Sequence, residues 1–257
     1  MSCHRGVLLL ITIAFLFTFS GCTDGEKNPK VTIAAAANMQ YAMRAIVKQF
    51  ENESGIKCDL IIGSSGKLTA QITEGAPYDI FVSADMKYPL ALSSAGLAHE
   101  PPQSYGYGQL VLWTTIEGLQ PSIALLKENS IHHIALANPQ IAPYGKAAIE
   151  VLDHYDLYDS LDHKLVYGES VSQTNQFISS KSAELGFTAA AVVLSPELKD
   201  KGSWIPLDSA SYKPIQQGAV LIKRDQTHLA DIKEFYAYLF SQEAKLLLKN
   251  YGYLTNE

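Results

Sequence analysis

The sequence predicts an α/β protein built of two lobes. Short apolar runs alternate along the chain with segments in which apolar residues recur every three or four positions, the pattern of strands followed by amphipathic helices. Such alternation predicts parallel sheets covered by helices on both faces. The series is interrupted by a stretch rich in Pro, Gly and Tyr at residues 100–108, which indicates a break between lobes. A later apolar run at residues 219–222 predicts a strand that returns to the first lobe.

The first lobe begins with the apolar run Val31–Ala36, which predicts a strand. A helix follows, and Gly55 ends it. The apolar face of this helix is formed by Met39, Ala42, Met43, Ile46, Val47 and Phe50. Asn38 lies at the junction, where we expect its short polar side chain to cap the free N–H groups of the first turn.

The later elements follow the same pattern. In the rest of the first lobe we expect strands at 58–62 and 79–83, a helix at 67–74 and a helix that starts at Asp85. The strands expected in the second lobe are 110–114, 134–137, 164–166 and 185–188. The late strand is followed by a helix at about 229–240 and by another that ends near Tyr251. These elements place one lobe at residues 31–106 plus 219–257 and the other at residues 107–218.

The first 22 residues have the features of a signal peptide and are excluded from the fold. Arg5 supplies a positive start, and the apolar run Val7–Phe19 is too short to span a bilayer comfortably. Cys22 follows two small residues in a pattern that resembles the lipobox of bacterial lipoproteins, which predicts lipid on Cys22. Phe19 stands where leucine is usual, so an uncleaved anchor and ordinary secretory cleavage are the alternatives. Residues 23–30 predict a flexible polar tether.

Composition excludes several classes of function. The formal net charge is −6 and the sequence has no cluster of Lys or Arg, so nothing indicates nucleic-acid binding. Cys58 is the one cysteine beyond the signal and the lipobox, so the mature domain has no internal disulfide, and Cys58 is expected to be a small buried hydrophobe. The histidines of the mature chain show no metal-ligand spacing. We therefore expect no cofactor and no directly coordinated metal.

Catalytic motifs are also missing from the sequence. It contains no Gly-x-Ser-x-Gly elbow and no dinucleotide fingerprint, and residues 63–67 lack the spacing of a phosphate-binding Walker loop. A secreted α/β hydrolase would need a base near Ser64 or Ser65, and only Lys67 is close in sequence. A binding protein is therefore expected rather than an enzyme.

Small hydroxyl- or amide-bearing residues recur where a predicted strand meets the start of a helix. The segments are Asn38, Ser64–Ser65, Tyr144–Gly145 and Val171–Ser172. Helix starts present free N–H donors and a partial positive charge, so several that converge form an anion site without Lys or Arg. In open α/β sheets ligands bind beyond the carboxyl ends of the strands, where all four segments are expected. Taken singly, Asn38 and Ser65 are more often plain helix caps, and residues 143–145 are more often only a loop that leads into a helix.

The order and spacing of these segments resemble the molybdate-binding proteins of ABC importers along nearly the whole mature chain. The resembling pieces are residues 31–38, 63–68, 75–85, 138–139 with 142–145, 185–187, 235–239 and 251–253. The resemblance implies the two-lobed periplasmic-binding-protein fold of type II, with the ligand in the cleft between the lobes. The piece from Gly75 to Asp85 is the most specific of these, and the Ala-rich first strand is the least.

The resemblance also implies the residues that hold the oxyanion. The family uses a hydroxyl residue after the first strand, a serine after the second, backbone N–H groups at two later helix starts and often a tyrosine hydroxyl. Carried over position by position, these places are Asn38, Ser65, Tyr144 and Val171, with Ala37 and Ser64 as additional candidates. Asn38 stands where the family usually has serine. The frequent tyrosine is Ala189 here, and we expect the Tyr144 hydroxyl to replace the missing donor.

The implied function is a substrate-binding lipoprotein that captures molybdate or tungstate and delivers it to an ABC permease. We expect a monomer outside the cytoplasmic membrane, anchored by lipid on Cys22. A site made only of donors favours a fully deprotonated dianion over a protonated phosphate, because an O–H facing another donor stays unpaired. A sulfate or other oxyanion binder is the nearest alternative. A secreted α/β hydrolase and a sensing or structural lipoprotein are the alternatives from other classes.

Overall fold

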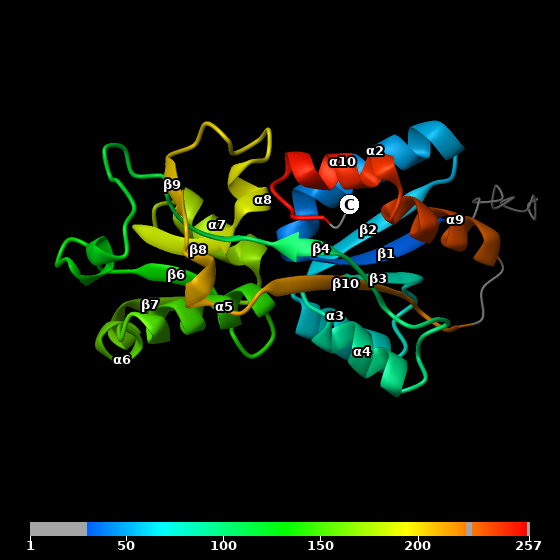
Figure 1. Cartoon of the computed structure of the whole chain (residues 1–257), viewed down its shortest axis with the longest axis horizontal. Helices are drawn as coiled ribbons and strands as arrows, with labels where there is room; N and C mark the ends of the chain where they lie inside the picture. Colours follow the sequence, from blue (N-terminus) through cyan, green and yellow to red (C-terminus); the bar gives the residue numbers. More distant parts are fainter. Residues whose placement is uncertain (1–29, 225–227, 256–257) are drawn as a thin grey trace, which may run out of the picture.

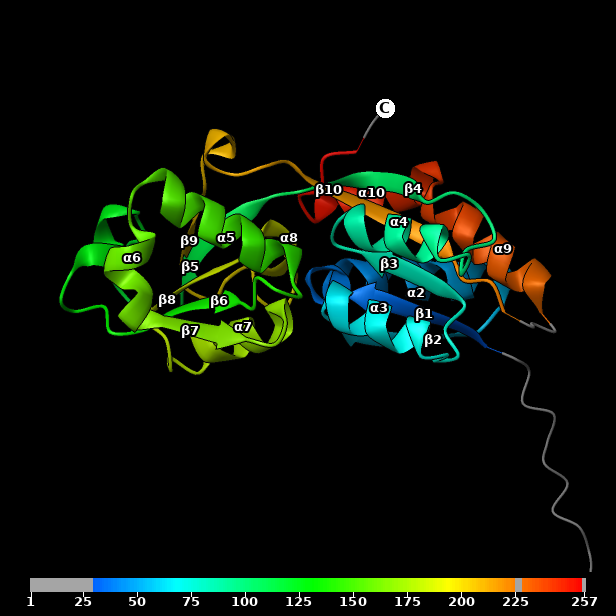
Figure 2. The same ribbon diagram turned by 90° about the horizontal axis from the view of Figure 1, so that it is seen from below.

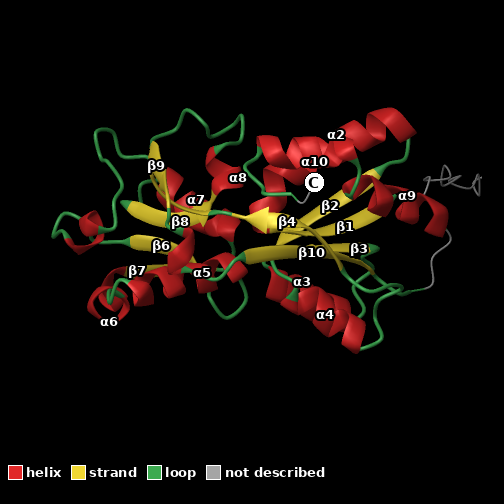
Figure 3. Ribbon diagram, viewed as in Figure 1, coloured by secondary structure: helices red, strands yellow, loops and turns green. Residues whose placement is uncertain are grey.

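The computed structural model describes residues 30–224 and 228–255, which form two lobes arranged side by side along the long axis (Figure 1). Each lobe contains a five-stranded sheet, with strand orders β2-β1-β3-β10-β4 and β7-β6-β8-β5-β9. Figure 3 shows the strands at the centre of each lobe and the helices around them. The two-lobed α/β fold that the sequence predicts is confirmed.

The first lobe is formed by both ends of the described chain. Its strands are β1 (Val31–Ala36), β2 (Cys58–Gly63), β3 (Ile80–Ser83), β4 (Gln103–Gly108) and β10 (Ile215–Leu221). Its helices are α2 (Gln40–Ser54), α3 (Ser65–Thr73), α4 (Lys87–Ser94), α9 (Leu229–Leu239) and α10 (Gln242–Asn250). The 3₁₀ turn η1 (Ala37–Met39) joins β1 directly to α2.

Alternating side chains of the first sheet enter two separate cores. Ile33 and Ala35 of β1 pack in the core that α2, α9 and α10 share, whereas Ala34 packs with residues of α3 and α4. Successive strand residues point to opposite faces, so an apolar run without polar positions is buried on both sides. This is why Val31–Ala36 has no polar residue except Thr32, at its outer end.

The second lobe holds the middle of the chain. Its strands are β5 (Leu110–Thr114), β6 (Ile134–Ala137), β7 (Leu165–Gly168), β8 (Leu185–Ala189) and β9 (Ser203–Pro206). Its helices are α5 (Pro143–His154), α6 (Tyr158–Leu161), α7 (Val171–Ser179) and α8 (Ala190–Val193), with 3₁₀ turns η2 (Ala124–Lys127), η3 (Asp162–Lys164) and η4 (Ser209–Ser211). Its core includes the fully buried Trp113 and the nearly buried Phe187.

The chain crosses between the lobes twice. It passes from β4 to β5 at Gln109, and from β9 to β10 through residues 207–214. Figure 2 shows both crossings along the same side of the molecule, with β1 and β6 each ending toward the other lobe. The two sheets therefore divide the chain at residue 109 and between residues 206 and 215. The lobe boundaries expected at 106–107 and 218–219 stay predictions.

Two expectations about the sheets are wrong. The sheets are mixed rather than parallel, because β10 runs antiparallel to β3 and β4, and β5 runs antiparallel to β8 and β9. The stretch at residues 100–108 is also more than a break, since Gln103–Gly108 forms strand β4. Its tyrosines favour a strand, and Gly106 lets the backbone of Leu254 approach: a Cβ there would lie 2.9 Å from the Leu254 carbonyl oxygen.

Local details at helix ends differ from the expectations in part. Gly55 ends α2 in the left-handed conformation, at φ 76°, as expected. Asn38 does not cap α2, because it lies inside η1 and its side chain makes no capping hydrogen bond. Asp85 precedes α4 instead of starting it, and its Oδ1 accepts a hydrogen bond from the Tyr88 N–H at 3.2 Å.

Cys58 is half-buried on the edge strand β2, where burial raises the pKa of its thiol to about 12.

The expected signal peptide, Cys22 and most of the tether lie outside the described residues. Within residues 30–224 and 228–255, no helix is long and apolar enough to cross a membrane.

Candidate functional site

A small cavity lies between the lobes, where the loops that follow several strands meet. Its walls come from residues on both sides of the interface, and they include every site residue expected from the sequence. The lining residues are Ala36, Ala37, Asn38, Ser64, Ser65, Ala84, Ala142, Pro143, Tyr144 and Val171. Segments separated by more than 100 positions in the sequence therefore meet at one point.

On the first-lobe side, η1 and the start of α3 line the cavity. Ala37 and Asn38 follow β1 without an intervening loop, and both are buried. Ser64 is the N-cap residue of α3, and Ser65 is its first residue. The first N–H groups of a helix have no partner within the helix, so both segments bring backbone donors to the cavity.

The hydroxyl groups of the two serines have different partners. The Ser65 Oγ accepts a hydrogen bond from the buried Ala84 N–H at 3.0 Å, which leaves the hydroxyl proton free to be donated. The Ser64 Oγ is buried and has no partner among the described residues. A buried polar atom without a partner is uncommon, so this hydroxyl fits a bound ligand.

On the second-lobe side, the starts of α5 and α7 face the cavity. Pro143 occupies the first turn of α5, and the preceding Ala142 is extended, with φ −122° and ψ 118°. This geometry places Tyr144 at the second position of the helix, where its N–H has no partner in the helix. At the start of α7 the Ser170 Oγ accepts a hydrogen bond from the N–H of Gln173, the third residue of the helix. This side chain does not cap the N–H of Val171, the first residue.

The Tyr144 side chain points to the hinge strands of the first lobe. Its ring is buried, and its hydroxyl accepts a hydrogen bond from the Gln217 Nε2 at 3.1 Å. The hydroxyl also lies against Gly108, where a Cβ would clash with it. Burial raises the pKa of the Tyr144 phenol, which therefore keeps its proton. Ala189 is buried at the end of β8 and does not line the cavity.

The lobes touch around the cavity through polar contacts. The Gly66 N–H of α3 donates to the Ile141 carbonyl oxygen at 2.9 Å, and the Ser172 hydroxyl donates to the Gln40 Oε1 at 2.6 Å. At the exposed rim, Lys67 and Glu169 form an ion pair at 2.5 Å. These contacts join α2 and α3 of one lobe to α7 and the α5 loop of the other, so the described conformation is closed.

No lining residue of the cavity carries a charged side chain. Its electrostatic character comes from the helix starts, which act as partial positive charges, and from hydroxyl and amide groups. The nearby Lys67 is half-exposed and paired with Glu169, so it supplies neither net charge nor a free base to the cavity. The serines therefore lack the neighbouring base that a hydrolase requires. The described residues also contain no group of three or more His, Cys, Asp or Glu that could hold a metal ion.

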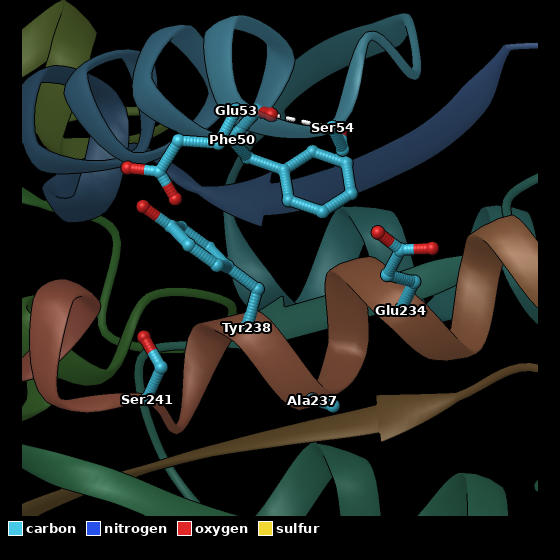
Figure 4. Close-up of a pocket in the computed structure, with 7 residues that line it drawn as sticks. All are labelled: Phe50, Glu53, Ser54, Glu234, Ala237, Tyr238 and Ser241. Carbon is cyan, nitrogen blue, oxygen red and sulfur yellow. Dashed lines mark hydrogen bonds between the residues drawn. The ribbon is translucent and has the colours of Figure 1, made fainter.

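Larger hollows lie elsewhere on the surface and have a different character. Figure 4 shows one on the outer side of the first lobe, between α2 and α9, with the Phe50 ring at its base. The carboxylates of Glu53 and Glu234 stand at its sides, so it repels an anion. Another lies beside the lobe crossings, where Tyr107, Leu110 and Tyr212 contribute to a mostly apolar wall. Neither contains a residue expected from the sequence to bind the ligand.

The sequence did not indicate every part of the site. Ala36, Ala84, Ala142 and Pro143 also line the cavity, and their small or rigid side chains give the backbone close access to it. Gln217, which contacts Tyr144, was also missed. Its only local signal is a polar residue beside an apolar run, which is common on any strand.

Comparison with known proteins supplies a family and close structural relatives. The family model for bacterial extracellular solute-binding proteins matches residues 31–254. The molybdate-binding protein ModA of Rhodobacter capsulatus is 36% identical over 88% of both chains. The ModA protein of Azotobacter vinelandii is 35% identical, and the match covers 87% of this chain and 89% of the relative.

Solved structures show the same arrangement of lobes. The Azotobacter vinelandii periplasmic molybdate-binding protein superimposes with a TM-score of 0.84 at 34% identity, covering 89% of this chain and all of that one. The sulfate-binding protein SubI of Mycobacterium tuberculosis superimposes with a TM-score of 0.71 at 14% identity, covering 87% and 86% of the two chains. The second likeness shows a shared fold alone.

Proposed function

The chain belongs to the bacterial extracellular solute-binding protein family, and on that premise we propose that it captures molybdate outside the cytoplasmic membrane and delivers it to an ABC permease. The observation that carries the proposal is the convergence of four helix starts on one small cavity without a charged side chain. Relatives that are 35% and 36% identical over most of the chain are named as molybdate-binding proteins. The chain acts in transport and is not an enzyme.

The oxyanion is held by donors from both lobes. Asn38 and Ser65 serve from the first lobe, and the N–H groups of Tyr144 and Val171 serve from the second. The Ser65 hydroxyl is suited to this role because its oxygen is occupied by the Ala84 N–H and its proton is not. Ala37 and Ser64 add further donors from the same wall. Together these groups surround a tetrahedral dianion without a buried cation.

Selectivity among the anions follows from their protonation state and size, because the protein offers only hydrogen-bond donors to the ligand oxygens. Molybdate and tungstate are deprotonated at neutral pH and can accept from every donor. A singly protonated phosphate brings one O–H into a wall of donors, and an unpaired buried polar group costs about 1–3 kcal/mol. Sulfate matches the charge but is smaller, so the closed lobes hold it with longer hydrogen bonds. We propose that tungstate binds about as well as molybdate.

Closure of the lobes around the ligand accounts for capture and release. In the described state the cavity is enclosed by contacts such as Gly66 with Ile141 and Lys67 with Glu169. A ligand that bonds to both lobes stabilises this closed state relative to an open one, by as much as its affinities for the two states differ. The permease then receives the protein in its ligand-bound conformation.

A calorimetric titration of the chain without residues 1–22 tests the proposed ligand. Molybdate and tungstate are expected to bind tightly and with similar affinity, whereas sulfate and phosphate bind more weakly. For phosphate, the unpaired O–H at about 1–3 kcal/mol weakens binding about 5- to 150-fold. The same cell, buffer and protein sample serve as the control for all four anions. Tighter binding of sulfate than of molybdate would overturn the assignment.

We further propose that the mature chain is a monomer anchored by lipid on Cys22. YvgL of Bacillus subtilis, which is 30% identical over 96% of both chains, carries the word lipoprotein in its name. Cys22 follows an apolar run and two small residues. Cys22→Ala is expected to release the protein from membranes or to leave an unprocessed precursor, measured by fractionation and by labelling with a fatty acid. Unchanged labelling of the variant contradicts the anchor.

A further inference from the structure

A cluster of buried polar side chains lies behind the cavity, where β4 and β10 leave the first lobe. At its centre is Gln217, which is completely buried on β10 beside an irregularity in the pairing of β10 with β4. The other members come from η1, β4, α5 and the C-terminal segment, and they are Asn38, Tyr105, Tyr144 and Tyr253. Two of the five, Asn38 and Tyr144, also line the cavity.

In the described arrangement the amide of Gln217 has a partner on each side. Its Oε1 accepts from the Asn38 Nδ2 at 2.9 Å and from the Tyr105 hydroxyl at 2.6 Å, while its Nε2 donates to the Tyr144 hydroxyl at 3.1 Å. The Asn38 Nδ2 donates also to the Tyr253 hydroxyl at 3.1 Å. The Asn38 Nδ2 therefore has both of its partners within the cluster.

This arrangement does not suit an anion. The Asn38 Oδ1 is buried and has no partner among the described residues. An unpaired buried acceptor is unfavourable even when the cavity is empty, and a carbonyl oxygen beside an oxyanion is repelled by it. If the proposed ligand is a deprotonated oxyanion, the side chain of Asn38 can donate to it only after its amide has turned over.

The positions of the same atoms allow the reversed arrangement. The oxygen and nitrogen of an amide are nearly equal in size, so a half-turn exchanges them in place. With both amides turned, the Gln217 Nε2 donates to the Asn38 Oδ1, and the Gln217 Oε1 accepts from the Tyr144 hydroxyl. The Tyr105 hydroxyl then accepts a hydrogen bond from the Gln217 Nε2 and donates one to the Ser83 carbonyl oxygen, which lies 2.9 Å away. If only one amide turned, two oxygens or two nitrogens would face each other at 2.9 Å.

The three tyrosines can serve either arrangement. Burial raises the pKa of Tyr105, Tyr144 and Tyr253, so each phenol keeps one proton to donate and an oxygen that accepts. The Tyr253 hydroxyl lies 3.2 Å from the backbone oxygen of Asn38 and 3.1 Å from its side chain, so it can donate to either. Only the hydroxyl hydrogens have to rotate when the amides turn.

We propose that Gln217 is a positioning residue whose amide turns together with that of Asn38, so that Asn38 presents an N–H to the bound oxyanion. The inference rests on the proposed function. In the turned arrangement the Tyr144 hydroxyl donates to Gln217 and holds the amide pair in place, instead of donating to the ligand. Because Gln217 does not touch the ligand, it contributes to affinity only through Asn38.

A double-mutant cycle on molybdate affinity tests this coupling. Asn38→Ala and Gln217→Met are each expected to weaken binding about 10- to 150-fold, the effect of one hydrogen bond to a charged group. The double variant is expected to bind no more weakly than Asn38→Ala alone, because the effect of Gln217 passes through Asn38. Tyr144→Phe is expected to lose less affinity than Asn38→Ala. Multiplicative losses in the double variant, or a larger loss in Tyr144→Phe, overturn the proposal.

A measurement on the unaltered protein covers the case in which Gln217→Met does not fold. In NMR spectra of the ligand-free chain, the side-chain NH₂ protons of Gln217 are expected close to the ring of Tyr144. On addition of molybdate they are expected to move close to the ring of Tyr105, and the Asn38 NH₂ signals should shift with them. If molybdate binds and these proximities do not change, the proposal is wrong. If molybdate does not bind the wild-type chain, the proposed function itself fails.

Discussion

Replacement of Ser65 by alanine separates the two tasks that the structure gives to this hydroxyl. Its oxygen accepts the buried Ala84 N–H at 3.0 Å, and its proton is available to the ligand. Ser65→Ala leaves the Ala84 N–H unpaired, which costs about 1–3 kcal/mol of folding stability. The loss of a donor to a charged ligand costs about 1.5–3 kcal/mol of binding free energy, or roughly 10- to 150-fold in affinity.

Both effects can be measured on the same sample. Thermal unfolding of the ligand-free protein reports the first, with about 2–4 °C expected for each kcal/mol in a chain of this size. Calorimetric titration with molybdate reports the second. Ser64→Ala is the matched control for the unfolding measurement, because the Ser64 Oγ has no partner among the described residues and its removal leaves no N–H unpaired. A Ser65→Ala protein that melts earlier but binds molybdate as tightly as wild type would show that Ser65 is purely structural.

Two further predictions concern closure and pH. Gly66→Ala places a Cβ 2.9 Å from the Tyr88 hydroxyl of the same lobe and 3.0 Å from the Ile141 Cα of the other lobe. The hydroxyl ends a side chain that can shift, whereas Ile141 presents backbone, so the substitution should hinder closure and weaken molybdate binding by about 1–3 kcal/mol. The melting temperature of the ligand-free protein should not fall, since alanine favours a helix. An earlier melt with unchanged affinity would contradict this reasoning. Burial opposes ionisation of Glu184, but N–H groups of His133 and His132 hold its pKa below the ordinary 4.5. Its ionised form therefore stabilises the fold above pH 4.5, and this contribution is lost as the pH falls through the lowered pKa. Denaturant unfolding of Glu184→Gln should show a deficit against wild type at about pH 7 that shrinks toward about pH 3. A deficit that stays constant with pH would refute the assignment.

The sequence predicted those parts of the site that are encoded locally. Ser65, Tyr144 and Val171 each stand where an apolar strand gives way to a helix, and that junction is visible in a short window of sequence. The resemblance to molybdate-binding proteins then indicated that these junctions meet, and the structure brings all of them to one cavity. The ligand contacts themselves stay a proposal.

The parts that the sequence did not predict depend on pairing between distant segments. Gln217 and Asn38 are 179 positions apart, and nothing near either residue indicates that their amides meet. Gln103–Gly108 looks like a break because Gly and Tyr alternate there, yet the segment becomes a strand once β10 lies beside it. The antiparallel direction of β10 was missed for the same reason, since alternation of strands and helices shows which elements exist and not which strands become neighbours.

The position of β10 between β3 and β4 has a consequence for how the chain is made. A ribosome that has synthesised the first 206 residues has produced the whole second sheet, but the first sheet still lacks the strand that separates β3 from β4. Until β10 emerges, β3 and β4 each have an edge without a neighbour, and such edges pair readily with other chains. The second lobe can therefore fold during synthesis, whereas the first must wait for the last fifth of the polypeptide.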